Sequence, residues 1–394
     1  MTAHAHVIVI GGGFAGVMAA NRLTQHPELT VTVINSRPVF VPRLRLHQLV
    51  GGADDVLVDY HEVLADRVRL LVDHVTRIDA AGRAVELADG SRLDYDYLVY
   101  AVGSGGAEPR VPGAGFTHAV ATLEAARDLR SRLDDTPGTA AVTVVGGGPT
   151  GIETAGELAE RGRRVTLLCG GTLGPYLHPR ARRTAARRLA RLGVTVLDGP
   201  GTKVTRVERD AVHLADGRVL PSEVTVWTAG FGVPDLAARS GLTTDSAGRL
   251  LTDETLTCVD DERIVAAGDS AAPSDLPFRM SAYAAGCLGA HAADTVLHRL
   301  AGQRAEPLDL SFNAMCVSIG SGAGIFQLAR KDDTARRLYV SGRAGAKLKG
   351  LTYTFSVKHL VKEAHRPGSH HWPKGEHRRE VLRSRPAQAP VAQP

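Results

Sequence analysis

The chain has 394 residues, of which 43% are hydrophobic and 23% are charged. These values exclude a wholly disordered chain, and the length suits two to three globular domains. The 47 Lys and Arg residues exceed the 42 Asp and Glu residues by only five, and aromatic residues make up 5% of the chain. Because so few aromatic side chains are available for base stacking, we expect no nucleic-acid partner.

The four cysteines are far apart in the sequence, at Cys169, Cys258, Cys287 and Cys316. This spacing argues against a zinc knuckle, a thioredoxin-like redox pair and a secreted disulfide framework. The first residues run into a strand-like segment without the pattern of a signal peptide, and no apolar run approaches the length that spans a bilayer. We therefore expect a cytoplasmic protein, with peripheral attachment to the cytoplasmic membrane face as an open alternative.

The sequence contains an internal duplication. Residues 7–23 (VIVIGGGFAGVMAANRL) and 142–158 (VTVVGGGPTGIETAGEL) each join a β-branched run, a glycine cluster and a helical pattern. Residues 75–103 and 204–230 then repeat a second pattern in the same order, each with an Ala-Asp-Gly turn. Strands that alternate with helices in this way predict parallel, doubly wound sheets.

We therefore predict an α/β protein with two Rossmann-like doubly wound domains. From about Asp309 onward, three strand-like segments and a helix predict a small C-terminal α+β domain. The tail from Arg385 is rich in Pro, Ala and Gln, a composition typical of disorder.

Both copies of the duplication carry the pattern G-x-G-x-x-G between a strand and a helix. The glycines permit a tight turn, and the free N–H groups at the start of the helix then face a pyrophosphate. The strand before the motif and the helix after it make the pattern specific for dinucleotide binding. The motif residues are Gly11, Gly13 and Gly16 in the first copy and Gly146, Gly148 and Gly151 in the second.

The strand after each motif lacks the acid that usually binds a ribose hydroxyl. The first copy ends in Asn35, Ser36 and Arg37, so Asn35 either binds the ribose without a charge or only starts a turn. The second copy ends at residues 169–171 (Cys-Gly-Gly). The arginines at 180–183 either reach a 2′-phosphate or form a solvated helix face, so the choice between NADH and NADPH stays open.

Two further acids lie at helix starts. Glu153 is one turn into the helix after the second glycine motif, where it either meets the nicotinamide end of the cofactor or favours the helix dipole. Gly268 and Asp269 close a strand and open a helix, where Asp269 either contacts a ribitol hydroxyl or phosphate, or caps the helix.

Taken together, the two glycine motifs and the segments YLVYAVGS (97–104), VWTAG (226–230) and IVAAGDSA (264–271) resemble the flavoproteins with two dinucleotide-binding domains, the FAD/NAD(P)H disulfide-reductase superfamily. The resemblance covers about residues 5–300. It implies bound FAD and NADH or NADPH, with the cofactors carrying the reaction. The missing cysteine pair removes the dithiol chemistry of the disulfide reductases.

This resemblance implies a division of the chain into five parts. The FAD-binding domain takes residues 1–110 and 233–303, and the NAD(P)H-binding domain takes 111–232. Residues 304–384 form the C-terminal domain, and 385–394 form the disordered tail.

Within the superfamily, the segments GGGPTGIETAGEL and VWTAGFGVPDL resemble the type II NADH dehydrogenases. The helix RMSAYAAGCLGAHAA and the C-terminal segment from residue 311 to 360 resemble the apoptosis-inducing-factor-like ferroptosis suppressor proteins, which are NAD(P)H:quinone oxidoreductases. The resemblance implies catalytic roles for Glu153, Tyr283 and Lys347. Tyr283 and Cys287 stand where the quinone-site Gln residues of the type II enzymes are expected, and Lys347 falls on a lysine near the flavin. It also implies cofactor contacts at Phe14, Ala15, Pro42, Arg43, Val75, Ala101, Val102, Gly103, Pro149, Thr150, Gly230, Ser281 and Ala282.

The function implied is that of an FAD-dependent NAD(P)H dehydrogenase, which passes hydride from NAD(P)H to FAD and two electrons on to a quinone or another small acceptor. Residues 330–385 hold 15 Lys or Arg and five Asp or Glu, so this region suits an anionic membrane surface or is merely solvated. The alternative function is a soluble reductase for an iron–sulfur protein or a biosynthetic substrate. No metal site is expected, and a homodimer is left open.

Overall fold

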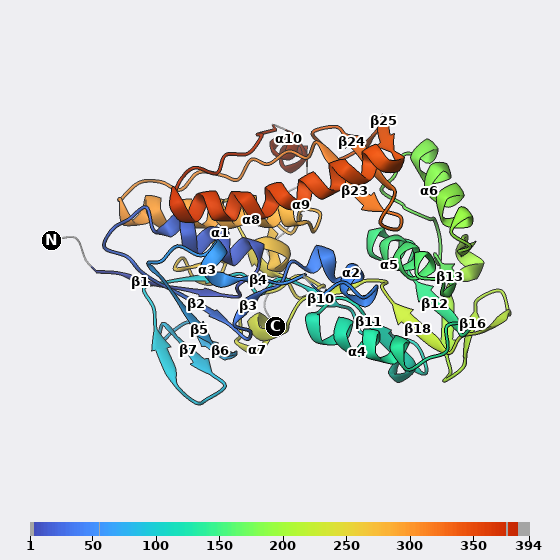
Figure 1. Ribbon diagram of the computed structural model, residues 1–394. Helices are drawn as coiled ribbons and strands as arrows, with labels where there is room; N and C mark the ends of the chain where they lie inside the picture. Colours follow the sequence, from blue (N-terminus) through green and yellow to red (C-terminus); the bar gives the residue numbers. More distant parts are fainter. Residues whose placement is uncertain (1–3, 55, 376, 385–394) are drawn as a thin grey trace.

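The computed structural model describes residues 4–54, 56–375 and 377–384. Two five-stranded parallel sheets form its two halves (Figure 1), in the orders β21-β9-β1-β2-β5 and β11-β18-β12-β13-β14. The central strands are runs of Val and Ile that are buried on both faces, as expected for parallel sheets. The strands of the first sheet are β1 (His6–Ile10), β2 (Thr30–Asn35), β5 (Val68–Val72), β9 (Tyr97–Tyr100) and β21 (Ile264–Ala266). Those of the second are β11 (Thr117–Ala119), β12 (Ala141–Val145), β13 (Arg164–Leu168), β14 (Thr195–Leu197) and β18 (Val224–Trp227).

Each half also carries a three-stranded antiparallel sheet, so the duplication expected from the sequence is present in space. The tight turn of each copy has a glycine in the left-handed region, Gly90 at φ +85° and Gly217 at φ +86°. The strands are β6 (Val75–Asp79), β7 (Ala84–Leu87) and β8 (Arg92–Asp94) in the first half, and β15 (Val204–Val207), β16 (Ala211–Leu214) and β17 (Val219–Pro221) in the second.

Helices α1 (Phe14–Leu23) and α8 (Ala282–Leu300) pack closely beside the first sheet. A Cβ atom on Gly289 would overlap the carbonyl oxygen of Ala15, so only glycine lets α8 approach α1 this closely. The close crossing places the start of α8 beside the first glycine loop. The second half carries α4 (Leu123–Asp134), α5 (Pro149–Glu160) and α6 (Pro179–Arg191).

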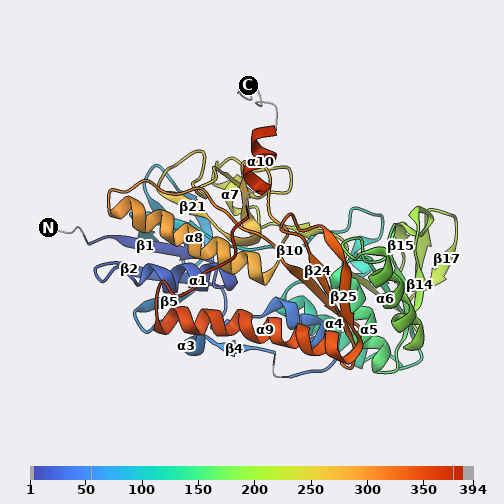
Figure 2. The same ribbon diagram turned by 90° about the horizontal axis from the view of Figure 1, so that it is seen from above.

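The C-terminal part consists of an antiparallel sheet and one long helix, α9 (Gly342–His365), which runs across both halves of the molecule (Figures 1 and 2). The sheet packs on α5, where a Cβ atom on Gly156 would overlap the backbone of Gly320. This contact holds the C-terminal part against α5, the helix that follows the second glycine motif. The strands are β23 (Ala314–Ser318), β24 (Gly324–Ala329) and β25 (Ala335–Ser341).

Short elements complete the fold. The last helix, α10 (His377–Ser384), stands apart from α9 in the view from above (Figure 2). Among the described residues, no helix combines the length and apolar character needed to cross a membrane. The tail predicted from Arg385 lies outside the described residues. The remaining elements are β3 (Val39–Phe40), β4 (Val58–Asp59), β10 (Gly105–Gly106), β19 (Phe231–Gly232), β20 (Leu250–Thr252), β22 (Ala271–Pro273), α2 (Leu46–Val50), α3 (Tyr60–Val63), α7 (Leu236–Arg239) and the 3₁₀ turns Arg43–Arg45, Ala114–Phe116, Pro200–Thr202 and Gly268–Ser270.

Candidate functional site

The first glycine loop joins β1 to α1 in a turn that only glycine can make. Gly11 lies at φ +101°, and a Cβ atom on Gly16 would overlap the carbonyl oxygen of Gly11. A Cβ on Gly13, by contrast, would meet no atom within 4 Å, and no side chain caps α1 at this residue. The start of α1 is therefore uncapped and has open space beside Gly13, which fits the pyrophosphate of a dinucleotide.

The second glycine loop repeats this geometry between β12 and α5. Gly146 lies at φ +126°, a Cβ on Gly151 would overlap the carbonyl oxygen of Gly146, and Gly148 faces open space. Pro149 occupies the first turn of α5, where its missing N–H costs no hydrogen bond. Two equivalent dinucleotide cradles thus lie at the carboxyl edges of the two sheets.

At the end of β2, the residues predicted to hold the ribose are engaged within the protein. The side chain of Asn35 accepts the N–H of Gly12 at 3.0 Å and donates to the carbonyl of Arg37 at 2.9 Å. Arg37 forms an ion pair with Glu124 of α4 at 2.5 Å. Ser36 lies 3.5 Å from the Arg37 guanidinium. Asn35 therefore shapes the glycine loop, and its ribose contact stays a prediction.

At the tip of β13, Gly170 and Gly171 present no side chain to a ribose, and the N–H of Gly170 is bonded to Thr202. Helix α6 buries Ala181, Ala185 and Leu189, whereas Arg180, Arg183, Arg187 and Arg191 are exposed. The arginines thus form the outer face of an amphipathic helix.

Three segments predicted to contact FAD meet through one polar cluster. Arg43 donates to the hydroxyl of Ser104 at 3.1 Å and to the carbonyl of Ala121 at 3.0 Å. Ser104 donates to Asp269 at 2.7 Å, and Arg43 lies 3.8 Å from the same carboxylate. The cluster fixes the loop after β9 against the turn after β21.

The other predicted cofactor contacts fall into three environments. Phe14, Pro149, Thr150, Ser281 and Ala282 line a cavity. Ala15, Val75 and Ala101 are buried in the core. Pro42 precedes the turn that carries Arg43, Val102 follows β9, and Gly103, Gly230 and Gly268 occupy loop positions with positive φ.

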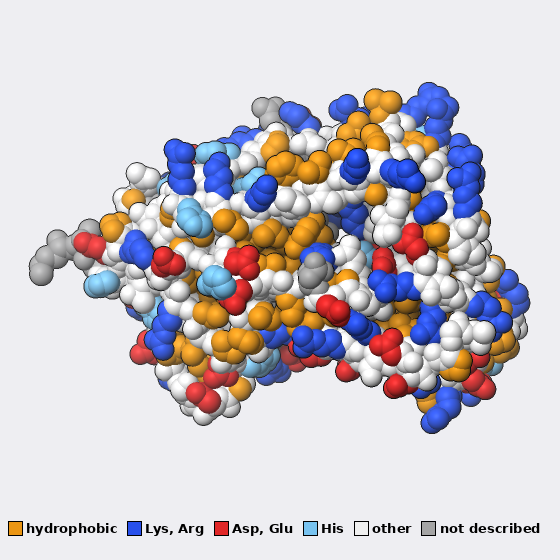
Figure 3. Space-filling model, viewed as in Figure 1, with side chains coloured by type: hydrophobic (Ala, Val, Ile, Leu, Met, Phe, Trp, Pro, Cys, Tyr) orange, Lys and Arg blue, Asp and Glu red, His pale blue; other side chains and the backbone are white. Residues whose placement is uncertain are grey.

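The cavity has a volume of about 690 Å³ and lies between the starts of α5 and α8 and under α9. Figure 3 shows this face of the molecule hollowed near its centre, with hydrophobic side chains on the left of the hollow and charged ones on its right. A size of this order suits a small-molecule site. Its apolar walls include Phe14, Met18, Phe278, Met280, Tyr283, Phe312, Met315, Phe326, Tyr353, Phe355 and Leu360.

Glu153 of α5 and Lys349 of α9 form an ion pair in the wall of this cavity. The carboxylate also accepts the N–H of Ser318 at 3.1 Å and lies 3.6 Å from Nδ1 of His47. Lys349 donates a second hydrogen bond, 2.8 Å long, to the hydroxyl of Ser318. One charged centre thus joins the start of α5, the end of β23, α2 and α9.

Burial and charge act in opposite directions on this centre. Burial favours a neutral Glu153, but the charge of Lys349 and the hydrogen bonds from Lys349 and Ser318 outweigh it and hold the pKa of Glu153 below its ordinary value. Burial lowers the pKa of His47 to about 4, despite the nearby Glu153 carboxylate. At neutral pH a neutral imidazole of His47 therefore lies beside the ion pair of Glu153 and Lys349.

The lysine in contact with Glu153 is two residues away from the predicted one. Lys347 is exposed on α9, and Lys349 points inward. Both lysines lie in the short run KLKG, whose pattern does not show which of them faces the cavity. No sequence motif marks His47 or Ser318 as site residues.

Tyr283 lines the cavity and donates to the carbonyl of Ser311 at 3.0 Å. Cys287 is buried one turn further along α8, and Cys316 lines the cavity beside Thr352. All four cysteines lie in the described residues and are free. The chain therefore has no redox-active disulfide.

The family model for pyridine nucleotide-disulphide oxidoreductases matches residues 5–289. The chain belongs to this family. It is 30% identical over 353 residues to an NADH dehydrogenase-like protein of Mycobacterium tuberculosis, covering 81% of this chain and 87% of the relative. It is 28% identical over 318 residues to a type II NADH:quinone oxidoreductase of the same organism, covering 69% of this chain and 68% of the relative.

The fold is similar to that of a solved NDH2 structure from Plasmodium falciparum, with a TM-score of 0.77 at 16% identity, covering 94% of this chain and 99% of the other. The comparison confirms the predicted α/β fold class. The family membership confirms the resemblance drawn from the motifs. The protein is an oxidoreductase that uses FAD and NAD(P)H, and the two uncapped glycine loops fit these two cofactors.

Proposed function

We propose that this protein is an FAD-dependent NAD(P)H dehydrogenase that delivers two electrons to a quinone. One observation carries the proposal: the start of the helix after the second glycine loop and the start of α8 open into the same apolar cavity. A nicotinamide, the flavin and an apolar acceptor would thus be held in one space. The bound flavin would take hydride from NAD(P)H and pass on two electrons.

The charged centre in the cavity wall supports this function. Two of the three donor positions of Lys349 are taken by Glu153 and Ser318, and the side chain lines the cavity. The third N–H group is therefore available to an oxygen atom of a bound ring. In a site shielded from water, such a fixed ammonium stabilises charge that develops on that oxygen.

We further propose that α9 lies against an anionic membrane surface. Its exposed side chains include Arg343, Lys347, Leu351, Phe355 and Lys358, so two large apolar residues stand between basic ones. The helix contains one acid, Glu363, and that residue is buried. Lys and Arg also line the upper edge of the molecule in Figure 3. Because Phe355 lines the cavity as well, an acceptor dissolved in lipid would enter here.

The test of the electron acceptor is steady-state oxidation of NADH and of NADPH by the purified flavoprotein. Fast turnover with a soluble naphthoquinone and slow turnover with oxygen alone is the expected result, and the faster nicotinamide identifies the cofactor. If a ferredoxin-type iron–sulfur protein is reduced and the quinone is not, the alternative of a soluble reductase replaces the proposal.

The membrane surface is tested by co-sedimentation with vesicles. Wild-type protein should bind vesicles that contain phosphatidylglycerol more tightly than vesicles of phosphatidylcholine alone. The double variant Leu351→Ser/Phe355→Ser should bind more weakly. Equal binding to both vesicle types, or none, would remove the proposed membrane surface and leave the quinone test unaffected.

A further inference from the structure

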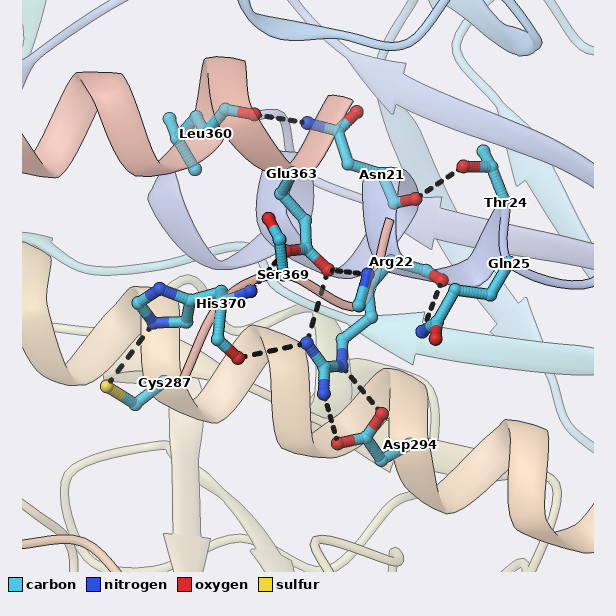
Figure 4. Close-up of polar contacts among 11 residues, drawn as sticks. Asn21, Arg22, Thr24, Gln25, Cys287, Asp294, Leu360, Glu363, Ser369 and His370 are labelled. Atoms are coloured by element: carbon cyan, nitrogen blue, oxygen red, sulfur yellow. Dashed lines mark hydrogen bonds and ion pairs between the residues drawn. The ribbon is translucent and has the colours of Figure 1, made fainter. Parts of the chain in front are cut away.

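A network of buried charges holds the chain after α9 against α1 and α8 (Figure 4). Arg22 of α1 pairs with Asp294 of α8 at 2.6 Å and with Glu363 of α9 at 3.2 Å. The same guanidinium donates to the carbonyl of His370 at 3.1 Å, and Glu363 accepts the N–H of His370 at 2.7 Å. Both backbone groups of His370 are therefore fixed by buried charges.

The imidazole of His370 lies in the wall of the cavity described above. Its Nε2 atom is 3.8 Å from Sγ of Cys287 (Figure 4). On its other side the ring contacts the ring of His359, with centroids 4.9 Å apart, and His359 is exposed to solvent. The titratable or charged groups that face His370 are Arg22, Cys287, His359, Lys362, Glu363 and His371.

Cys287 connects His370 to Tyr283. The two residues are one helical turn apart on α8, so their side chains share a face, and the Cys287 thiol and the Tyr283 hydroxyl interact. Burial raises the pKa of Cys287 to about 12 and also raises the pKa of Tyr283. Both groups therefore carry their protons at neutral pH. A row of proton-bearing side chains thus runs from the surface at His359 to the cavity at Tyr283.

The proposed reaction requires a proton at that place. Its balance is NAD(P)H + H⁺ + quinone → NAD(P)⁺ + quinol, so the hydride supplies two electrons and one proton, and solvent supplies the second proton. Apolar side chains, among them Met280 and Phe312, line the cavity near Tyr283. A quinone that fills the cavity displaces water from these walls, so its oxygen would take the proton from a side chain that lines the cavity.

We propose that His370, Cys287 and Tyr283 relay this proton from solvent, through His359, to the quinone oxygen; the inference rests on the proposed function. Tyr283 turns its hydroxyl from the carbonyl of Ser311 to the quinone oxygen, gives that oxygen its proton and takes the thiol proton of Cys287. Cys287 takes the N–H proton of His370, which is replaced from solvent at His359. Each group loses one proton and gains one, so every group keeps its charge, and both electrons come from NAD(P)H.

The relay is tested by comparing an acceptor that takes up protons with one that does not. Ferricyanide accepts electrons alone, so the ratio of naphthoquinone to ferricyanide reduction isolates proton delivery. Because a positioned relay contributes a factor of at least about 10², Cys287→Ala should lower this ratio by about tenfold or more and raise the solvent deuterium isotope effect. Cys287→Ser should restore both, because a hydroxyl carries a proton as the thiol does. Cys258→Ala, a change at a buried thiol outside the cavity, is the matched control.

A second measurement needs no turnover. The infrared S–H stretching band of Cys287, identified by its loss in Cys287→Ala, should shift to higher frequency in His370→Phe, because the sulfur loses the N–H donor that polarises its S–H bond. An unshifted band, or a Cys287→Ala enzyme with the wild-type ratio and isotope effect, overturns the relay while the proposed function stands. If wild type reduces ferricyanide and no quinone, both proposals fall.

Discussion

Lys349 of α9 and Glu153 of α5 form a buried ion pair across 196 positions of the chain. The pair joins the C-terminal helix to the helix start of the second glycine loop. Both side chains are only 12% exposed, so neither charge is well solvated without the other. The ion pair thus couples the packing of the C-terminal part to the electrostatics of the cavity.

We expect Lys349→Met to be much more damaging than Lys347→Met. Loss of Lys349 leaves Glu153 buried without its main counter-charge, which should cost about 3–5 kcal/mol of stability and raise the pKa of Glu153. Lys347 is exposed, so its loss should change stability by less than about 0.5 kcal/mol. Thermal unfolding and the pH profile of NAD(P)H oxidation report both effects. Equal effects of the two substitutions would contradict the assignment of Lys349.

The two glycine loops should respond differently to alanine. Gly13 and Gly148 have ordinary negative φ and face open space, so alanine at either position is compatible with folding. Gly13→Ala should weaken FAD retention, because its methyl group occupies space expected for the pyrophosphate. Gly148→Ala should keep the flavin and raise the KM for NAD(P)H about tenfold, equivalent to about 1.4 kcal/mol. Flavin absorbance after gel filtration measures FAD retention, and steady-state kinetics measure the KM for NAD(P)H. Loss of flavin from Gly148→Ala would show that the assignment of the second loop to NAD(P)H is wrong.

Stability should fall as the pH falls from about 6.5 to about 4. Burial lowers the pKa of His47 and of His370 to about 4, so over this window the unfolded chain binds protons that the folded chain does not. Each group then removes about 1.4 kcal/mol of stability per pH unit. His370→Gln should weaken this acid sensitivity, whereas His371→Gln, at the exposed neighbouring residue, should retain it. Thermal midpoints between pH 7 and pH 5 measure the difference; identical slopes in the two variants would argue against a neutral, buried His370.

Arg22→Met should loosen the end of α9. The substitution leaves Asp294 and Glu363 without their shared guanidinium, and we expect a loss of about 3–5 kcal/mol and faster hydrogen exchange in residues 360–372. The comparison is Arg37→Met, which breaks a more exposed pair with Glu124 and should cost at most about 1 kcal/mol. Unchanged exchange at the end of α9 would show that other contacts hold this segment.

The local pattern of the sequence was sufficient for the architecture and for both cofactor loops. The strand–glycine–helix order and the repeated inserts predicted two equivalent sheets. Such signals can be read from the sequence because hydrophobic periodicity and glycine turns depend on residues that are close together in the chain. Gly11, Gly16, Gly146 and Gly151 occupy the tight positions that the motif requires.

The charged centre and the relay were decided only by tertiary packing. Successive helix residues point about 100° apart, so which lysine of the run KLKG faces inward depends on the side of α9 that packs on the β23–β25 sheet and α5. The contact of Cys287 with His370 depends likewise on the Arg22 network that returns the chain to α8. The sequence by itself therefore determined which cofactors the fold is built to hold. The long-range contacts, which periodicity does not encode, determined which side chains meet in the cavity.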